Sequence, residues 1–166
     1  VTKNNPDDDR CCGGEWRNQT KINIGGAYDG NKSPVAAVPP VIQAQDNKTF
    51  NYQLVATDAD GDSLNFRWGK VQEFFVADGT GNTDNFTMPT GMTLSTSGLL
   101  SWDVRDSVLC SGCSQDDTND VDDLWVAVIM VEDRHDNGSV KSYVPVDFFF
   151  KTRETSNAAA DFTQIP

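Results

Sequence analysis

The sequence has no long hydrophobic run, little positive charge and a single histidine. Its longest apolar stretch, LWVAVIMV at 124–131, is the length of a strand, and a membrane-spanning helix needs roughly 18 apolar residues. There are 13 Lys and Arg against 25 Asp and Glu, so the formal net charge is -12. This sign argues against nucleic acid and anionic lipid as partners. We therefore predict a soluble chain without membrane insertion, whose favoured partners are divalent cations or cationic proteins.

Helical periodicity over three turns is also missing, and short segments of period-two alternation take its place. Phe50, Tyr52 and Leu54 alternate with polar residues, and Leu64, Phe66 and Trp68 do the same after an Asp-rich turn. The stretch MPTGMTLSTSGLLSW predicts a tight hairpin that turns at Ser97–Gly98.

Two further strands are predicted in the C-terminal half of the chain. Residues 124–132 are apolar at successive positions, as in a central strand that is buried on both faces, and 139–151 reads as the last strand. The prolines of SPVAAVPPVIQAQ suit an edge strand or an extended entry. About seven short strands at spacings near ten residues predict an all-β antiparallel sandwich.

The chain divides into three parts by composition. Residues 1–33 are rich in turn formers and predict an extended N-terminal segment, 34–151 form the sandwich, and 152–166 read as a C-terminal linker or arm. A length of 166 residues suits one domain of about 120 residues with extensions. No charged-then-apolar leader precedes Val1, so we expect either a removed signal peptide or, as we favour, a piece of a longer protein.

Cysteines and sequons predict an oxidising, secreted setting. The four cysteines are even in number, and five N-x-S/T sequons exceed what chance would give. The candidate glycosylation sites are Asn18, Asn31, Asn47, Asn85 and Asn137. Asn31 is the weakest of them because Pro34 follows its Ser33, and chance sequons are the alternative.

The cysteines are adjacent at Cys11 and Cys12 and spaced C-x-x-C at Cys110 and Cys113. Two disulfides are favoured over a zinc site, which is awkward for adjacent cysteines, and over a redox motif, which needs a βαβ setting that this chain lacks. Pairings that join the first pair to the second are favoured, because a bond between neighbouring residues is strained. Either cross-pairing closes a loop of about a hundred residues, which contributes about 4 kcal/mol in the chain-entropy model.

The stretch VATDADGDSLNF offers candidate ligands for calcium. An EF-hand is excluded because its sixth and twelfth positions, counted from Asp58, are Ser63 and Gly69. A loop site remains, in which sandwich topology brings the Asp-rich turn near the acidic end of a late strand. Its candidate ligands are Asp58, Asp60, Asp62, Glu132, Asp133 and Asp136. The alternative is a plain Asp/Gly turn, and the acidic loop Asp116 to Asp123 is a second candidate site.

Three motifs in order carry a resemblance to a known family. YQLVATDADGDSLNFRW, MPTGMTLSTSGLLSWD and LWVAVIMVEDRHDNGSV together resemble the cadherin-like, dystroglycan-type immunoglobulin-fold modules of large extracellular proteins. The resemblance covers about 34 to 151. It implies a seven-stranded sandwich, usually tandem or embedded in a long chain, with structural or adhesive roles and no catalysis. The CCGGEW segment, the stretch from Lys70 to Thr87 and the Cys-bounded acidic loop depart from the family pattern.

We therefore expect a non-enzymatic structural or adhesive module of a cell-surface or matrix glycoprotein, whose partners are neighbouring modules or copies of itself and N-linked glycans. Catalysis has no local signature, and the lone His135 lies in a predicted turn. One alternative is the protomer of an extracellular filament, assembled through its terminal arms by strand addition. Another is a carbohydrate-binding module that uses Trp residues such as Trp16 and Trp68, although Trp in strands is more often core.

Overall fold

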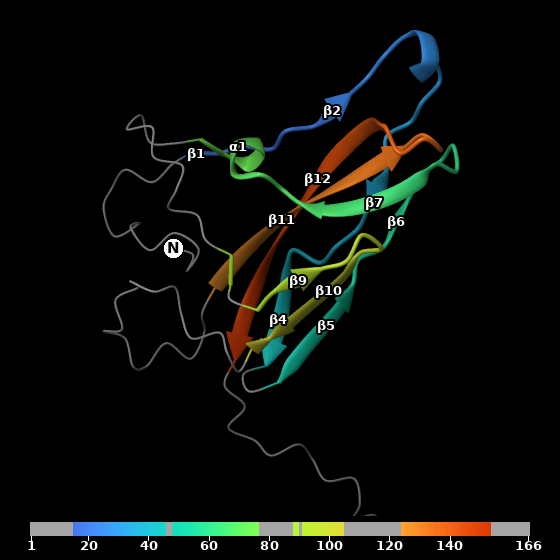
Figure 1. Ribbon diagram of the computed structural model, residues 1–166. Helices are drawn as coiled ribbons and strands as arrows, with labels where there is room; N and C mark the ends of the chain where they lie inside the picture. The colour runs from blue at the N-terminus through green and yellow to red at the C-terminus, as the bar shows by residue number, and fades with distance from the viewer. Residues whose placement is uncertain (1–14, 46–47, 77–87, 90, 105–123, 154–166) are drawn as a thin grey trace, which may run out of the picture.

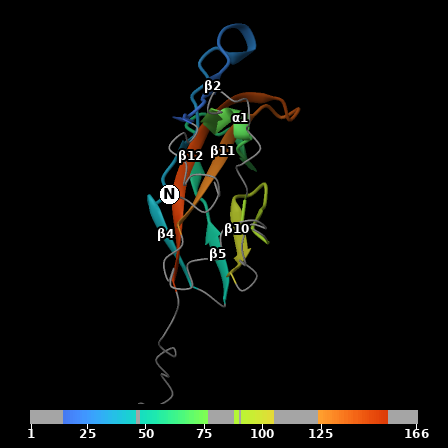
Figure 2. The same cartoon turned by 90° about the vertical axis from the view of Figure 1, so that its left-hand side faces the viewer.

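The computed structural model describes residues 15–45, 48–76, 88–89, 91–104 and 124–153. Two β-sheets form two facing layers (Figure 2). The larger sheet runs β2-β12-β11-β7 with β4 also on β12, and the smaller runs β5-β10-β9. Their bounds are β2 (Lys21–Ile22), β4 (Val41–Gln45), β7 (Ser63–Trp68), β11 (Leu124–Arg134), β12 (Val140–Arg153), β5 (Thr49–Gln53), β9 (Thr93–Leu94) and β10 (Leu99–Asp103). The predicted all-β antiparallel sandwich is confirmed.

The remaining elements are short. Strand β1 (Glu15–Trp16) pairs with β8 (Phe75–Val76), and β3 (Val35–Ala36) pairs with β6 (Ala56–Thr57). The described residues include a 3-10 turn at Gly26–Tyr28 and a short helix, α1 (Val71–Phe74). Neither is long and apolar enough to cross a membrane.

The strand order is that of an immunoglobulin-like sandwich. Strands β7, β11 and β12 occupy the C, F and G positions of one sheet, and β5, β10 and β9 occupy the B, E and D positions of the other (Figure 1). The first strand is divided in two: β3 pairs with β6 in a separate two-stranded sheet, and β4 then runs parallel to β12 in the large sheet. Pro39 and Pro40 lie between β3 and β4. Because proline donates no backbone hydrogen bond, this is where the chain leaves one sheet for the other.

The core lies between the two sheets and is aromatic. Trp102 and Phe150 are completely buried, and the rings of Trp102 and Trp125 meet edge to face with centroids 6.2 Å apart. Ring pairs of this geometry stabilise a core beyond the area that they bury. The period-two alternation predicted for residues 50–56 holds in the structure, with Phe50, Tyr52 and Leu54 on the covered side and their neighbours exposed.

The central strand β11 is buried on both faces, as its continuous apolar sequence predicts. Its inner side chains join the main core, and Val128 and Met130 on the outer face form a second, smaller cluster with Phe74 and Tyr143. Phe74 comes from α1, which therefore covers part of the outer face (Figure 1). This cover explains why side chains on both faces of β7 are at least partly buried.

An N-terminal strap, residues 15–25, crosses the same outer face. It pairs through β1 with β8 and through β2 with the start of β12, where Lys21 and Ile22 lie opposite Tyr143 and Ser142. The predicted N-terminal segment thus contributes two short strands, and one of them extends the large sheet.

Strand β12 contains a proline in its middle, opposite Met130 of β11. On the other side of β12, the strap covers residues 142–143 and β4 covers 149–153. Between them, no strand of the described chain pairs with β12. Pro145 therefore occupies a local sheet edge, the position at which a missing backbone N–H is tolerated.

Candidate functional site

Polar side chains gather at the end of the sandwich where β12 begins. We call this group the polar pole: Asn31, Asp58, Asp62, Asp133 and Lys141. Carboxylate oxygens of its three aspartates lie within 4.8 Å of one another. They come from the turn before β7 and from the end of β11, so the fold brings together segments about 70 residues apart in sequence.

Asp133 is the buried centre of the polar pole. It has no exposed surface, and its carboxylate accepts hydrogen bonds from the backbone N–H of Ser142 and from Nδ2 of Asn31 at 2.8 Å. Ser33 also contacts Ser142, with 3.2 Å between the hydroxyl oxygens. These bonds fasten the segment before β3 to the sandwich.

The DADGD sequence folds as a side-chain-capped turn. Asp58 Oδ1 accepts from the N–H groups of Asp60 at 2.8 Å and Asp62 at 3.2 Å, and Gly61 supplies a left-handed conformation with φ 78°. The plain Asp/Gly turn and a cation site are therefore compatible, because only one carboxylate oxygen of Asp58 takes part in the turn. Its other oxygen, Oδ2, is buried and accepts no hydrogen bond, and Oδ1 of Asn31 is in the same state.

Lys141 enters the polar pole through a β-bulge. Asp133 pairs with Ser142 but Arg134 pairs with Val140, so Lys141 is the extra residue of β12. Its Nζ donates to both oxygens of Asp62 at 2.6 Å. The hydrogen bond to Asp62, opposed by burial and aided by the nearby aspartates, raises the pKa of Lys141. One lysine thus faces three carboxylates, which leaves the polar pole with an excess of two negative charges.

The other predicted calcium ligands lie elsewhere. Asp60 is bound to the backbone and the Nζ of Lys32, at 2.6 and 2.9 Å, and this lowers its pKa. Glu132 is next to Asp133 in β11 and so projects to the opposite face of the sheet. Asp136 is exposed in the turn before β12.

A divalent cation fits part of this geometry. Calcium prefers six to eight oxygen ligands, and the polar pole offers three carboxylates and an amide oxygen, including two buried oxygens that lack hydrogen-bond donors. Asp58, Asp133 and Asn31 are the residues that would hold the ion. Lys141 already neutralises Asp62, so it would compete with a cation for that ligand.

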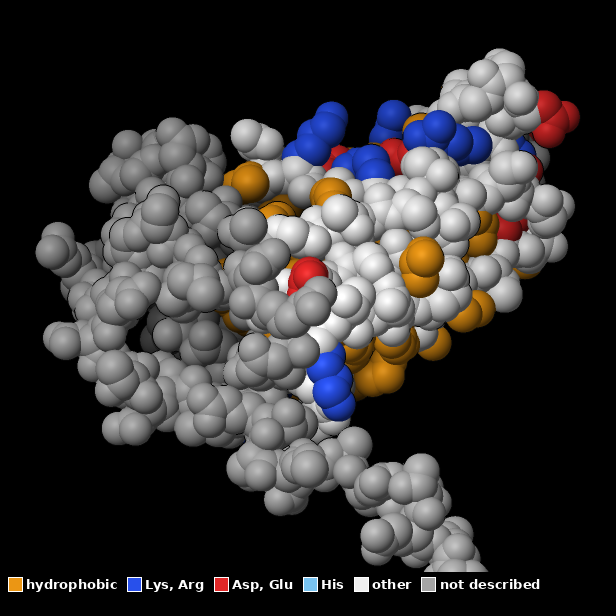
Figure 3. Space-filling view, turned by 60° about the horizontal axis from the view of Figure 1, so that its bottom comes forward, with side chains coloured by type: hydrophobic (Ala, Val, Ile, Leu, Met, Phe, Trp, Pro, Cys, Tyr) orange, Lys and Arg blue, Asp and Glu red, His pale blue; other side chains and the backbone are white. Residues whose placement is uncertain are grey.

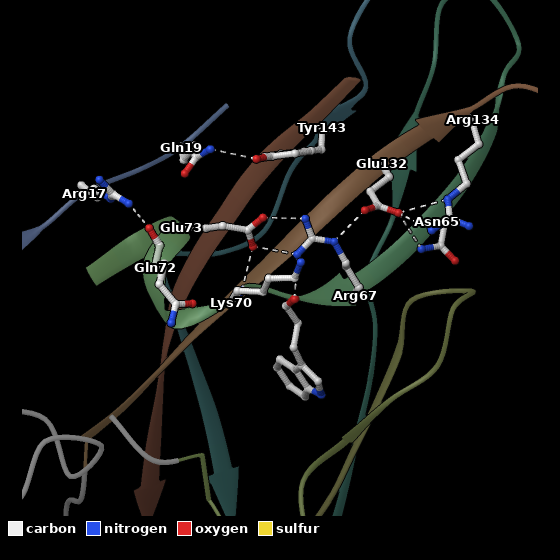
Figure 4. Close-up of polar contacts among 11 residues, drawn as sticks. Arg17, Gln19, Asn65, Arg67, Lys70, Gln72, Glu73, Glu132, Arg134 and Tyr143 are labelled. Atoms are coloured by element: carbon white, nitrogen blue, oxygen red, sulfur yellow. Dashed lines mark hydrogen bonds and ion pairs between the residues drawn. The ribbon is translucent and has the colours of Figure 1, made fainter. Parts of the chain in front are cut away.

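A second cluster, the Arg67 network, lies on the outer face of the large sheet (Figure 4). Arg67 donates through both terminal nitrogens to Glu73 of α1, at 2.7 and 2.8 Å, and through Nε to Glu132 at 2.6 Å. Its guanidinium also lies 5.2 Å from the ring centre of Tyr143. Glu132 accepts further from Asn65 and Arg134. With both sides of its guanidinium occupied by carboxylates, Arg67 acts as a clamp between β7, β11 and α1.

The network shifts the ionisation of its members. Burial alone would raise the pKa of Glu73, but hydrogen bonds from Arg67 and from the N–H of Lys70 outweigh it and lower the pKa. The pKa of Glu132 is lowered in the same way, with burial opposed by Arg67 and Arg134. The carboxylate of Glu73 raises the pKa of Arg67, which stays charged. The three groups are therefore ionised together in the folded protein.

The sequence pattern does not predict this network. Arg67 lies on the partly polar face of an alternating strand, and Glu132 lies near the end of a strand that is otherwise apolar. Glu73 lies in a stretch without a clear pattern. An arginine between Phe66 and Trp68 was the available signal, because a half-buried guanidinium needs an acidic partner.

Other predicted site residues have varied surroundings. His135 is half-buried in its turn, with its ring 5.4 Å from that of Tyr28. Trp68 is half-buried against the core, and Trp16 lies in β1. All four cysteines, the sequons at Asn47 and Asn85 and the acidic loop from Asp116 to Asp123 lie outside the described residues.

The described sequons differ in access. Asn18 and Asn137 are exposed, and the side-chain oxygen of Asn137 accepts from the N–H and hydroxyl of Ser139 at 2.9 and 2.7 Å. Asn31 is half-buried, and the nitrogen that would carry a glycan donates to Asp133. A glycan at Asn31 would therefore break the polar pole.

Basic and acidic side chains lie near one another on the visible part of the described surface. Figure 3 shows Lys and Arg side chains with a few Asp and Glu between them along the upper margin, and hydrophobic side chains over the middle and along the lower margin. The exposed apolar residues include Val41, Val55 and Leu99. Single apolar side chains of this kind are normal on protein surfaces.

Comparison with known proteins gives no match. No family model matches this chain, and no curated protein is similar to it in sequence. The cadherin-like resemblance therefore stays a prediction, and function must be argued from the geometry.

Proposed function

We propose that this chain is a non-enzymatic, load-bearing module of a secreted glycoprotein, of the structural or adhesive kind. The observation that supports the proposal is where the sandwich is entered and left. Near the start of β12, Asn31 donates to Asp133 and Ser33 contacts Ser142. The described chain leaves the sandwich at Arg153, the end of β12. A strand of 14 residues spans roughly 45 Å, so entry and exit lie at opposite ends.

The pairing of β4 with β12 suits this role. The two strands are parallel and pair from Val41 and Phe149 to Gln45 and Arg153. Tension that pulls β4 by its N-terminal end and β12 by its C-terminal end acts along the strands in opposite directions. The ladder hydrogen bonds then carry the load together, and none can open singly before the others.

Single-molecule pulling on tandem copies of the chain tests this. Phe149 N–H donates to the carbonyl of Pro40, so the alternation of a parallel ladder directs the N–H groups of Ile42 and Ala44 toward β12 and that of Gln43 away from it. We expect Ala44→Pro to lower the unfolding force clearly and Gln43→Pro to leave it close to wild type. Equal forces for wild type and Ala44→Pro would contradict a load-bearing β4–β12 ladder.

Calcium at the polar pole belongs to the same proposal. An ion held by Asp58, Asp133 and Asn31 would tie the entry segment more firmly to the sandwich and so stiffen a junction with whatever precedes it. Glycans on Asn18 and Asn137 would shield the outer surface. Both features fit a secreted protein, and neither needs a catalytic group.

A filament protomer is the second candidate, and the strap favours it. Residues 15–25 form a terminal arm that lies against a sheet edge by strand pairing, which is the contact that strand addition between subunits would use. The sugar-binding alternative has less support, because Trp68 is packed partly against the core.

A further inference from the structure

Within the described part of the chain, the strap is fastened by few contacts. Besides the two pairs at β1 and the two at β2, Arg17 N–H donates to Phe74 and its side chain to Gln72, and Gln19 donates to the Tyr143 hydroxyl at 3.1 Å. Asn23 donates to the carbonyls of Lys141 and Val140 through its backbone and side chain. Each such bond adds only about 1 kcal/mol to stability.

The strap buries little apolar surface over its described side chains. Residues 17–22 are all exposed, and Ile22 and Ile24 are 59% and 84% exposed. Hydrophobic burial, the main force that holds strands to a fold, therefore contributes little over 17–24. Segments with exposed hydrogen bonds and little burial open at low cost in free energy.

A glycine hinge follows the strap. Gly25 and Gly26 both have positive φ, 83° and 59°, and an added Cβ at either would meet no atom within 4 Å. The backbone can therefore turn here without breaking packing, because glycine adopts both hands of conformation with little penalty. A weakly held strand next to a free hinge is the arrangement that permits exchange between copies.

We propose that the strap exchanges between copies of this chain, so that β2 of one copy pairs with the start of β12 in the next. The proposal rests on the filament form of the proposed function, and in it the predicted disulfides of Cys11 and Cys12 join the copy that receives the strap. The exchanged contact is identical to the internal one, so it needs no new complementary surface. When each copy donates its strap to the next, the contact is head-to-tail and builds an open chain of subunits.

A labelled strap peptide tests the acceptor edge. A fluorescent peptide of residues 15–25 is titrated with the full chain and followed by anisotropy, with an Asn23→Pro peptide as the control. The control lacks the N–H that binds the Lys141 carbonyl and the side chain that binds Val140. We expect saturable binding of the natural peptide and at least about fivefold weaker binding of the control, the equivalent of about 1 kcal/mol.

The Asn23→Pro substitution in the full chain should have the opposite effect, an increase in the affinity for the natural peptide. The Asn23→Pro chain holds its own strap less firmly, so its edge should bind the natural peptide about fivefold or more tightly than the wild-type chain does. Unchanged far-ultraviolet circular dichroism would show that this chain is folded. Equal binding of natural and control peptides, no binding at all, or no gain in the Asn23→Pro chain would each overturn the proposal.

Sedimentation of the full chains separates this proposal from the filament function. Association of wild type that is lost in Asn23→Pro supports both. Association that persists in Asn23→Pro overturns strap exchange and leaves the filament function standing on another surface. A wild-type chain that stays monomeric while it binds the peptide would show only that the strap can be displaced, and it would overturn both strap exchange between copies and the filament function.

Discussion

At the scale of single residues, the molecule places its charges in two separate settings. The polar pole keeps an excess of carboxylates around one lysine, while the Arg67 network balances an arginine between two glutamates. The difference is visible in the hydrogen bonds, since Arg67 is occupied on both sides whereas Asp58 retains a buried oxygen without a donor. The first setting has capacity for a cation, and the second serves stability.

The Arg67 network predicts a loss of stability in acid. Because the pKa of Glu73 is lowered below its ordinary 4.5, its contribution is complete above pH 4.5 and is lost as the pH falls through the lowered value. We expect Glu73→Gln to lower the free energy of unfolding by about 1.5–3 kcal/mol at neutral pH. Urea titrations across pH should show wild type and variant converging in acid, and the exposed Asp136→Asn should behave as wild type.

The polar pole predicts a selective response to calcium. Asp58 and Asp60 belong to one turn, but only Asp58 lies in the carboxylate group, because Asp60 is paired with Lys32. Wild type should gain stability in calcium, by about 2.7 kcal/mol at a hundredfold excess over Kd. Thermal unfolding with calcium or with chelator should show this gain in Asp60→Asn and not in Asp58→Asn. A gain that survives Asp58→Asn would place the ion elsewhere.

At the scale of elements, alternation predicted most strands but not what lies on their outer faces. Residues 50–54, 64–68 and 99–102 were readable because one face of each contacts a single apolar core. The bulge at Lys141 was not readable, since a bulge depends on the register with β11. The cover of α1 and the strap was missed for a similar reason: α1 has four residues, too few for a helical period to appear.

The hairpin between β9 and β10 gives a test at this scale. Gly98 has φ 87°, and a Cβ there would lie 3.0 Å from the Leu54 carbonyl and 3.1 Å from the Phe66 ring. We expect Gly98→Ala to destabilise the fold by about 2 kcal/mol or more, because strain and close approach act together. Gly138→Ala is the matched control, with a similar φ of 82° and open space around it, and should cost less in a denaturant titration.

At the scale of the whole molecule, the candidate site was only partly predictable. The sequence indicated that the DADGD turn and the end of β11 share one end of the sandwich, and Asp58, Asp62 and Asp133 do meet there. Glu132 could have been excluded as a ligand from the sequence alone, because it neighbours Asp133 in a strand and neighbouring side chains point to opposite faces of a sheet. Asn31 and Lys141 could not be assigned, because their positions depend on the entry segment and on the bulge.

Glycan occupancy follows from the same geometry. Asn18 and Asn137 are exposed, whereas Asn31 uses its amide nitrogen in the polar pole. Peptide mass spectrometry of protein from its native source should therefore find glycan on Asn137 and Asn18 and an unmodified Asn31. Full occupancy at Asn31 would mean that the polar pole is not formed when the chain is glycosylated.

The unpaired stretch of β12 around Pro145 has a consequence for solubility. Folded proteins meet other unfolded and partly folded chains, and an open sheet edge is where such chains would add and begin to aggregate. Pro145 presents no backbone N–H at this opening, so an incoming strand would find its hydrogen-bonding pattern interrupted in the middle. The ring of Pro145 thus protects the gap that the described strands leave between β2 and β4, so that this edge does not offer a template for amyloid growth.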